Sequence, residues 1–243
     1  MTAITDFIYA APQDTIEPFK FDETVAEVFQ DMIERSVPGY GTSLEMISLV
    51  ARKFAKPFTT GYDLGSSLGA STFAMRHGMK QNGCSLVAVD NSESMMTKFK
   101  ELLEASPDGI PVKPVVDDIQ NVPITNASMV TLNFTLQFIS PHERLPLLKR
   151  IYDGLVPGGA LVISEKIVFP DRAEQDLQTQ LHHSFKRANG YSDLEVAQKR
   201  TSLENVLIPD TLHQHHQRLK AAGFNHVYLW FQCFSFVSLL AHK

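Results

Sequence analysis

The chain has 243 residues, of which 44% are hydrophobic and 20% are charged, and its formal net charge is −5. This length and composition are ordinary for one globular α/β domain with a full core. The negative charge argues against direct contact with nucleic acid, because surfaces that bind nucleic acid carry clustered Lys and Arg side chains. A small-molecule substrate is therefore favoured.

The sequence contains no apolar run of about 18 residues, the length that would predict a membrane-spanning helix. Its amino terminus also lacks the charged and apolar regions of a signal peptide. We therefore expect a soluble, cytoplasmic protein without a membrane partner.

The amino-terminal part predicts an irregular arm and two helices. Residues 1–20 show no clear period, whereas apolar residues recur at helical spacing from Asp22 until Pro38 ends the pattern. Thr42 and Glu45 have the spacing of a capping box, which predicts the start of the second helix.

A tyrosine between two glycines, Tyr40, lies between the two predicted helices. Its ring and hydroxyl are suited to folding over a ligand. An ordinary surface turn explains it equally well, and the local sequence does not decide between the two.

The stretch Thr60–Ser71 predicts a strand, a tight turn and a helix start. Gly65 and Gly69 permit backbone torsions that are closed to other residues, and at Gly65 the backbone can approach a ligand closely. Asp63, at the end of the strand, can accept hydrogen bonds from an ammonium group. The G-S-S-L-G spacing argues against a dinucleotide, so an adenosine-containing ligand is favoured. An ordinary strand-to-helix turn is the alternative.

Acidic residues follow the next two predicted strands. Residues 85–90 predict a buried parallel strand that ends in Asp90, where a carboxylate can accept two ribose hydroxyls or simply cap the next helix. A helix leads to a third strand over residues 112–116, which is followed by Asp118. This acid either meets the exocyclic amine of adenine or belongs to a solvated loop.

The middle of the chain continues the alternation of strands and helices. A fourth strand over residues 127–134 places Asn133 at its carboxyl edge. Ser140–Glu143 predicts a helix start with a proline at the first position and a capping box, and Leu155–Gly159 predicts a turn into a fifth strand over residues 160–165. Such alternation predicts a parallel sheet with helices on both faces.

The alternation breaks after the fifth strand. Residues 166–210 are mostly polar and predict two helices, over residues 175–186 and 194–206, without a strand. We expect this insertion above the carboxyl edges of the sheet, where a lid or a partner surface would lie. A helix over residues 211–222 and two strands between residues 227 and 241 close the chain.

No metal site is predicted. Cys84 and Cys233 lie far apart and fit no metal or redox spacing, so we expect reduced thiols in or near the core. His213 and His216 share a helix face, but no nearby cysteine completes a site.

Taken together, these motifs resemble the class I S-adenosylmethionine-dependent methyltransferase superfamily. D-L-G-S-S-L-G is similar to its first motif, V-A-V-D-N to its second and D-D-I to its third, and L-V-P-G-G precedes the fifth strand. The resemblance implies a Rossmann-like α/β fold with a seven-stranded, mostly parallel sheet. It also implies one S-adenosylmethionine-binding domain over residues 1–243, with an N-terminal helical cap at 1–58 and the helical insertion at 166–210.

Five further segments resemble the carboxy-S-adenosyl-L-methionine synthase family: V-P-G-Y-G-T, Y-D-L-G-S-S-L-G-A-S, N-F-T-L-Q-F, N-G-Y-S-D-L-E and L-W-F-Q-C-F. This resemblance implies a transferase that moves a carboxyl group from prephenate to the methyl group of S-adenosyl-L-methionine. The products would be carboxy-S-adenosyl-L-methionine and phenylpyruvate, the former for 5-oxyacetyluridine at the tRNA wobble position. The hydroxide that leaves prephenate would remove the methyl proton, so the protein need not supply a strong base. The resemblance also suggests a homodimer.

The resemblance assigns the residues that would hold S-adenosylmethionine. They are Tyr40 as a cover, Gly65, Ser66 and Ser67 at the methionine part, Asn133 at the sulfonium, Asp90 and Asn91 at the ribose, and Asp118 and Ile119 at the adenine. Arg200 is the expected catalytic residue, because its guanidinium can grip the carboxylate of the product through two parallel hydrogen bonds. From the local sequence alone, an exposed helix arginine is the alternative.

Two other functions remain open from the sequence. A conventional small-molecule methyltransferase would use the same pocket and would methylate an acceptor without prephenate. A non-catalytic binding protein would lose only affinity for a carboxylated ligand when Arg200 is removed. The net charge of −5 favours the synthase, since an enzyme that acts on tRNA directly would need a basic face.

Overall fold

The computed structural model describes residues 4–243, and its centre is a seven-stranded sheet in the order β3-β2-β1-β4-β5-β7-β6. The strands are β1 (Thr60–Leu64), β2 (Ser85–Asp90), β3 (Val112–Val116), β4 (Ala127–Asn133), β5 (Leu155–Lys166), β6 (His226–Cys233) and β7 (Phe236–His242). Strands β1 to β5 pair in parallel, while β7 runs antiparallel to both β5 and β6. The predicted mostly parallel α/β sheet is therefore confirmed.

Eight α-helices and one short 3-10 helix surround this sheet in the described part of the chain. They are α1 (Glu23–Ser36), α2 (Tyr40–Phe54), α3 (Ala70–Gly78), α4 (Glu93–Glu104), η1 (Leu136–Phe138), α5 (Pro141–Gly154), α6 (Arg172–Ala188), α7 (Asp193–Leu203) and α8 (Leu212–Ala222). Successive strand residues point to opposite faces, and neighbouring β4 residues show this directly. Met129 packs with α2 and α3, whereas Val130 packs with α5 and α8.

The local signals for helix starts were partly wrong. Helix α2 begins at Tyr40, two residues before the predicted capping box, because Gly39 adopts a left-handed conformation (φ 74°) and lets the chain enter the helix earlier. Helix α5 does have Pro141 at its first position, as predicted, but the Ser140 hydroxyl pairs with His142 at 2.8 Å instead of capping the backbone. Both predicted capping boxes are therefore absent from helices α2 and α5.

The fifth strand is longer than predicted. Residues 155–159 belong to β5 itself instead of forming a separate turn before it. The ladder between β4 and β5 changes register in this part, and Gly158 has a φ of 71°. An irregular strand segment has the sequence features of a turn, and for this reason the strand was predicted to start at residue 160 and not at residue 155.

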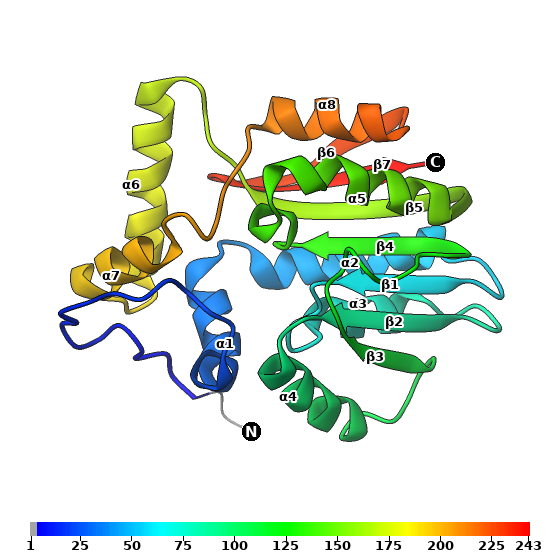
Figure 1. Cartoon of the computed structure of the whole chain (residues 1–243), viewed down its shortest axis with the longest axis horizontal. Coiled ribbons are helices and arrows are strands. Elements are labelled where there is room, and N and C mark those ends of the chain that lie inside the picture. Colours follow the sequence, from blue (N-terminus) through cyan, green and yellow to red (C-terminus); the bar gives the residue numbers. More distant parts are fainter. Residues whose placement is uncertain (1–3) are drawn as a thin grey trace.

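The insertion between β5 and α8 contains the two predicted helices, α6 and α7, and leaves the fold at the carboxyl end of β5. Figure 1 shows both helices beside α1 and the amino-terminal arm, beyond the ends of the strands from which the insertion departs. An isolated parallel bridge between Ile167 and Asp210 joins the two ends of the insertion.

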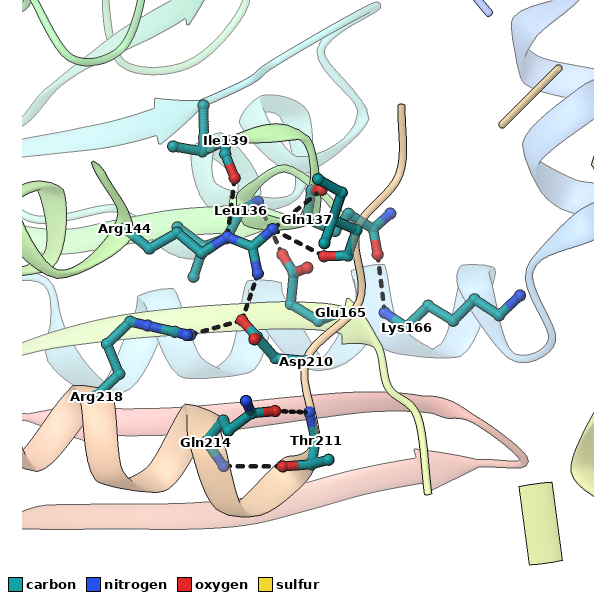
Figure 2. A network of polar contacts seen from close by, with 11 residues as sticks. Leu136, Gln137, Ile139, Arg144, Glu165, Lys166, Asp210, Thr211, Gln214 and Arg218 are labelled. Atoms are coloured by element: carbon teal, nitrogen blue, oxygen red, sulfur yellow. Dashed lines mark hydrogen bonds and ion pairs between the residues drawn. The ribbon is translucent and has the colours of Figure 1, made fainter. Parts of the chain in front are cut away.

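A buried ionic network holds the return of the insertion in place. Arg144, which is fully buried, donates to the carbonyl oxygens of Ile139 and Ile208 at 2.8 Å each and pairs with Asp210. Arg218 lies 2.8 Å from the same Asp210 carboxylate, and Figure 2 shows the two guanidinium groups on either side of it. Two cations around one buried carboxylate fix the position of the returning chain.

None of the helices within residues 4–243 combines the length and the apolar character that a membrane span requires.

Candidate functional site

A cavity of about 820 Å³ lies at the carboxyl edge of the parallel strands. Its walls come from the loops after β1 to β4, from α1 and α2, and from the insertion. In open α/β sheets this edge is where ligands bind. The volume lies within the range of about 300 to 1,000 Å³ that small-molecule sites occupy.

The glycine turn after β1 forms one side of this cavity. Gly65 has a φ of 82°, and a Cβ atom at this position would collide with Thr135. The amide nitrogens of Gly65 and Ser66 both donate to the Val89 carbonyl, at 2.8 and 2.9 Å. The turn is therefore tied to β2 and leaves open backbone facing the cavity.

Asp90 lies at the end of β2, as predicted, and also lines the cavity. It accepts hydrogen bonds from the backbone amides of Ser67 at 2.8 Å and Ser92 at 2.9 Å. Burial raises the pKa of Asp90, and these two amides oppose that shift. The carboxylate is thus held in a fixed orientation that suits the two hydroxyls of a ribose.

The predicted adenine end lies next to Asp90. The Asn91 amide donates to the Asp118 carboxylate at 2.8 Å, and both residues line the cavity together with Ile119. A carboxylate beside an apolar side chain matches the amine and the ring of an adenine. The structure thus brings together the residues predicted for the ribose and the adenine.

Asn133, at the end of β4, carries an unsatisfied acceptor. Its amide nitrogen donates to the Ser71 hydroxyl at 2.9 Å, whereas its buried Oδ1 atom has no hydrogen-bond partner within residues 4–243. A buried acceptor without a donor is costly, so a donor from a ligand would be favoured here. The methionine ammonium of S-adenosylmethionine is such a donor, and the residues present therefore fit that ligand.

Tyr40 is the first residue of α2 and lines the cavity with only 8% of its surface exposed. Its ring centroid lies 6.4 Å from that of Phe134. Burial, with a smaller contribution from Asp63, raises the pKa of Tyr40, so that its hydroxyl stays protonated. The predicted cover residue thus belongs to a helix instead of a turn and presents its ring to the site.

Asp63 differs from its prediction. It is fully buried, it does not line the cavity, and its two oxygens accept the hydroxyls of Thr72 at 2.6 Å and Thr131 at 2.8 Å. Burial raises its pKa to about 6 despite these hydrogen bonds. Asp63 therefore lies behind the glycine turn and ties β1 to α3 and β4, and the expected direct contact with a ligand ammonium is not formed by this geometry.

Arg200 lies on α7, where its side chain is exposed and does not line the cavity. Its positive charge nevertheless lowers the pKa of Lys166, which does line the cavity, although burial is the larger cause. Arg200 therefore lies near the cavity without entering it, and its role toward a carboxylate stays a prediction.

Lysines on the insertion side of the cavity were missed by the sequence reasoning. Lys166 ends β5, Lys186 belongs to α6 and Lys199 to α7, and all three line the cavity. Burial and neighbouring positive charges lower the pKa of Lys186 to about 8. Burial also lowers the pKa of Lys199 to about 7. No local motif marks these lysines, because helices α6 and α7 are mostly polar.

Phenylalanine rings from several elements also line the cavity. They are Phe19, Phe21, Phe29, Phe73, Phe134, Phe138 and Phe236. The cavity therefore has a polar part at the sheet edge and a part that is both aromatic and cationic below the insertion. Within residues 4–243, no group of three His, Cys, Asp or Glu side chains is placed to hold a metal ion.

Solved structures of methyltransferases have the same fold. Human N-acetylserotonin methyltransferase in complex with SAM aligns with a TM-score of 0.62 and 18% identity, over 100% of this chain and 63% of the other. A structure described as a putative S-adenosyl-L-methionine-dependent methyltransferase from Methanococcus maripaludis aligns with a TM-score of 0.60 and 19% identity, over 95% and 97% of the two chains. This similarity identifies the class I methyltransferase fold.

Relatives found by sequence share far more identical residues with this chain than these solved structures do. A family model described as a methyltransferase domain matches residues 62–159. The carboxy-S-adenosyl-L-methionine synthase of Geobacter metallireducens is 56% identical over 245 residues, which cover 100% of both chains. The protein of the same name from Vibrio vulnificus is 52% identical over 98% of this chain and 97% of its own length. The chain therefore belongs to the carboxy-S-adenosyl-L-methionine synthase family.

Proposed function

We propose that the protein transfers a carboxyl group from prephenate to the methyl group of S-adenosyl-L-methionine and so forms carboxy-S-adenosyl-L-methionine and phenylpyruvate. The observation that carries this proposal is the identity of 52 to 56% with synthases of that name over nearly the full length of the chain. The cavity supports it, because it fits S-adenosylmethionine at the sheet edge and extends below the insertion, where a second substrate has room.

The proposed reaction balances without a base from the protein. Prephenate loses carbon dioxide and hydroxide and becomes phenylpyruvate. The carbon dioxide forms a bond to the methyl carbon in place of one proton, and that proton leaves with the hydroxide as water. The residues of the chain then bind the two substrates, orient them and exclude bulk water, which is the role that the apolar rings around the cavity suit.

We further propose that Arg200 grips the new carboxylate of the product. One charge-assisted hydrogen bond contributes about 1.5 to 3 kcal/mol, which is roughly a tenfold to hundredfold preference for the carboxylated over the methyl form. Because Arg200 is exposed beside the cavity, it reaches a ligand either after a movement of α7 or from a second copy of the chain.

The wider role follows the family resemblance. We propose a cytoplasmic homodimer whose product serves the formation of 5-oxyacetyluridine at the tRNA wobble position. The net charge of −5 supports a supplier of the modified substrate that does not itself bind nucleic acid. Leu177 (54% exposed), Leu181 and Leu194 (37% each) on α6 and α7 supply apolar surface for self-association.

The test is to incubate the protein with S-adenosylmethionine and prephenate and to analyse the products by mass spectrometry. Carboxy-S-adenosylmethionine and phenylpyruvate in equal amounts are expected. Absence of both would overturn the proposal. Release of S-adenosylhomocysteine with a methylated acceptor, in the absence of prephenate, would instead identify a conventional methyltransferase.

A further inference from the structure

Three lysines from separate elements converge on one wall of the cavity. Lys186 and Lys199 are each only 6% exposed, and Lys166 is partly buried. All three residues line the same cavity, and burial together with the charge of Lys166 lowers the pKa of Lys186, while burial together with the charge of Lys186 lowers that of Lys199. Burial is the larger cause in both cases. A folded chain does not gather buried cations in this way without a cost in stability.

Few negative charges balance this lysine wall, which consists of Lys166, Lys186 and Lys199. Asp6 lies 4.0 Å from the Lys199 ammonium, but it also accepts a hydrogen bond from the Tyr191 hydroxyl at 2.7 Å. Within residues 4–243, no carboxylate lies within 4.0 Å of the ammonium groups of Lys166 or Lys186. Asp6 and Glu195 act on the Lys186 ammonium from farther away and raise its pKa, so within the described residues three lysines face two nearby carboxylates, and only the Asp6–Lys199 pair comes within 4.0 Å.

The lysine wall is built on a fixed support. The backbone amide of Lys166 donates to the side-chain oxygen of Gln137 at 3.0 Å, and Figure 2 shows its side chain extending away from the Arg144–Asp210 pair. The same Arg144 donates to the Ile208 carbonyl at 2.8 Å and so holds the chain where it returns from α7, the helix that carries Lys199.

Aromatic rings surround the lysine wall. The Lys199 ammonium lies 5.5 Å from the centroid of the Phe19 ring, and the Lys186 ammonium lies 5.2 Å from that of Tyr191. The rings of His182 and Phe236 are 4.9 Å apart, and both residues line the cavity. Burial is the main cause that lowers the pKa of His182 to about 3, so this ring is neutral and adds no charge. Cations next to flat apolar surfaces suit an acid that also carries a six-membered ring.

We propose that Lys166, Lys186 and Lys199 form the binding site for the second substrate and hold the carboxylate that is retained in its keto-acid product. This inference rests on the proposed function and assigns its substrate subsite. The retained carboxylate is the appropriate partner for the lysines, because a cation bound to the departing carboxylate would stabilise it against loss of carbon dioxide. The departing carboxylate then lies toward the sulfonium side, away from the wall.

Phenylpyruvate is the probe for this site, since it carries the retained carboxylate and reacts no further. Its affinity is measured by calorimetry in the presence of S-adenosylmethionine, with phenylacetone, which lacks the carboxylate, as the control ligand. Wild-type protein is expected to bind phenylpyruvate at least tenfold more tightly than phenylacetone. Equal affinities for the two ligands would overturn the inference.

Lys186→Met and Lys199→Met keep the length of the side chain and remove its charge. Each is expected to weaken phenylpyruvate binding about tenfold to hundredfold, the range for one charge-assisted hydrogen bond, and to raise the KM for prephenate more than it lowers kcat. The affinity for S-adenosylmethionine should change less than about twofold, which is below 0.5 kcal/mol. The exposed Lys220→Met is the matched control and should change none of these quantities.

A second readout separates binding from a structural role. Lys186 has no carboxylate within 4.0 Å in the described part of the chain, so Lys186→Met should raise the melting temperature of the ligand-free protein, whereas loss of a purely structural lysine would lower it and would contradict the inference. Unchanged phenylpyruvate affinity and prephenate KM in both variants would overturn the inference. If wild-type protein makes no carboxylated product but the lysines still govern phenylpyruvate binding, the reaction fails and the subsite stands.

Discussion

The two parts of the cavity are built on different plans. The sheet-edge part holds its polar groups through hydrogen bonds within the chain, as Asp90 shows with two backbone amides. The insertion part leaves charges unbalanced, as Lys186 shows with a pKa lowered to about 8, mainly by burial. The first part is ready for the hydroxyls and the ammonium of a cationic ligand, and the second requires an anion to be complete. Two substrates of opposite character are thereby kept apart within one cavity.

The largest expected effect concerns the support of the insertion part. Asp210→Ala leaves the buried Arg144 without its counter-ion, and breaking a buried pair in this way costs about 3 to 5 kcal/mol. The free energy of unfolding in urea measures the loss. The control is Asp176→Ala, which removes an exposed pair with Arg172 and should cost at most about 1 kcal/mol. Equal losses in the two variants would mean that the network does not anchor the insertion.

The next effect falls on the sheet-edge part alone. Asp90→Ala removes the carboxylate that is predicted to bind the ribose. We expect S-adenosylmethionine to bind about a hundredfold more weakly, because hydrogen bonds to a charged group contribute about 3 kcal/mol. Calorimetry with S-adenosylmethionine checks this, with the exposed Asp108→Ala as control. An unchanged affinity for S-adenosylmethionine would contradict a role of Asp90 in binding this ligand.

Arg200 provides a test on the outer side of the insertion part. Arg200→Ala should lower the affinity for carboxy-S-adenosylmethionine about tenfold to hundredfold and leave that for S-adenosylmethionine nearly unchanged, because only the product carries the new carboxylate. Competition binding with the two ligands measures the ratio. Arg200→Lys should give an affinity ratio between those of Arg200→Ala and the wild type, because an ammonium lacks the two parallel donors of a guanidinium. A ratio equal to that of the wild type would exclude this role.

Phenylpyruvate binding is expected to depend on pH, because the pKa of Lys199 in the insertion part is lowered. Burial lowers the pKa of Lys199 to about 7, with Asp6 opposing the shift and Lys186 and Arg35 adding to it. A bound anion favours the protonated lysine, so binding takes up a proton above pH 7 and affinity falls by at most about tenfold per pH unit per lysine. Calorimetry between pH 7 and 9 checks the slope, which should be smaller in Lys199→Met. A slope identical to that of the wild type would show that Lys199 is not the group that takes up the proton.

The sheet-edge part could be predicted from the sequence because its residues lie directly after strands. Gly65, Asp90 and Asn133 each follow or end a strand, and parallel strands bring their carboxyl ends to one edge. Asp63 shows the limit of this rule. A strand position places it near the edge, but only the tertiary contacts with Thr72 and Thr131 decide that its oxygens face inward.

The lysine wall could not be predicted in the same way. Lys186 and Lys199 are 13 positions apart on α6 and α7, and the turn between the two helices decides whether their side chains face the same cavity. In a mostly polar helix a buried lysine looks like an exposed one, because burial leaves no period in the sequence. The helix starts were misjudged for a related reason, since Gly39 sets the start of α2 through a backbone torsion that no side-chain motif reveals.

The bridge between Ile167 and Asp210 has a consequence for engineering. Both ends of the insertion meet at this bridge, so an exchange of residues 168–209 would leave the strand pairing of the sheet intact. A replacement helical hairpin would have to reproduce the contacts of His182 with the Ser36 carbonyl and of Gln198 with the Tyr9 carbonyl, while Asp90 keeps its two backbone partners. The proposed acid-binding lysines of α6 and α7 thus lie on a different segment from the glycine turn and Asp90, so the two segments can be varied one at a time.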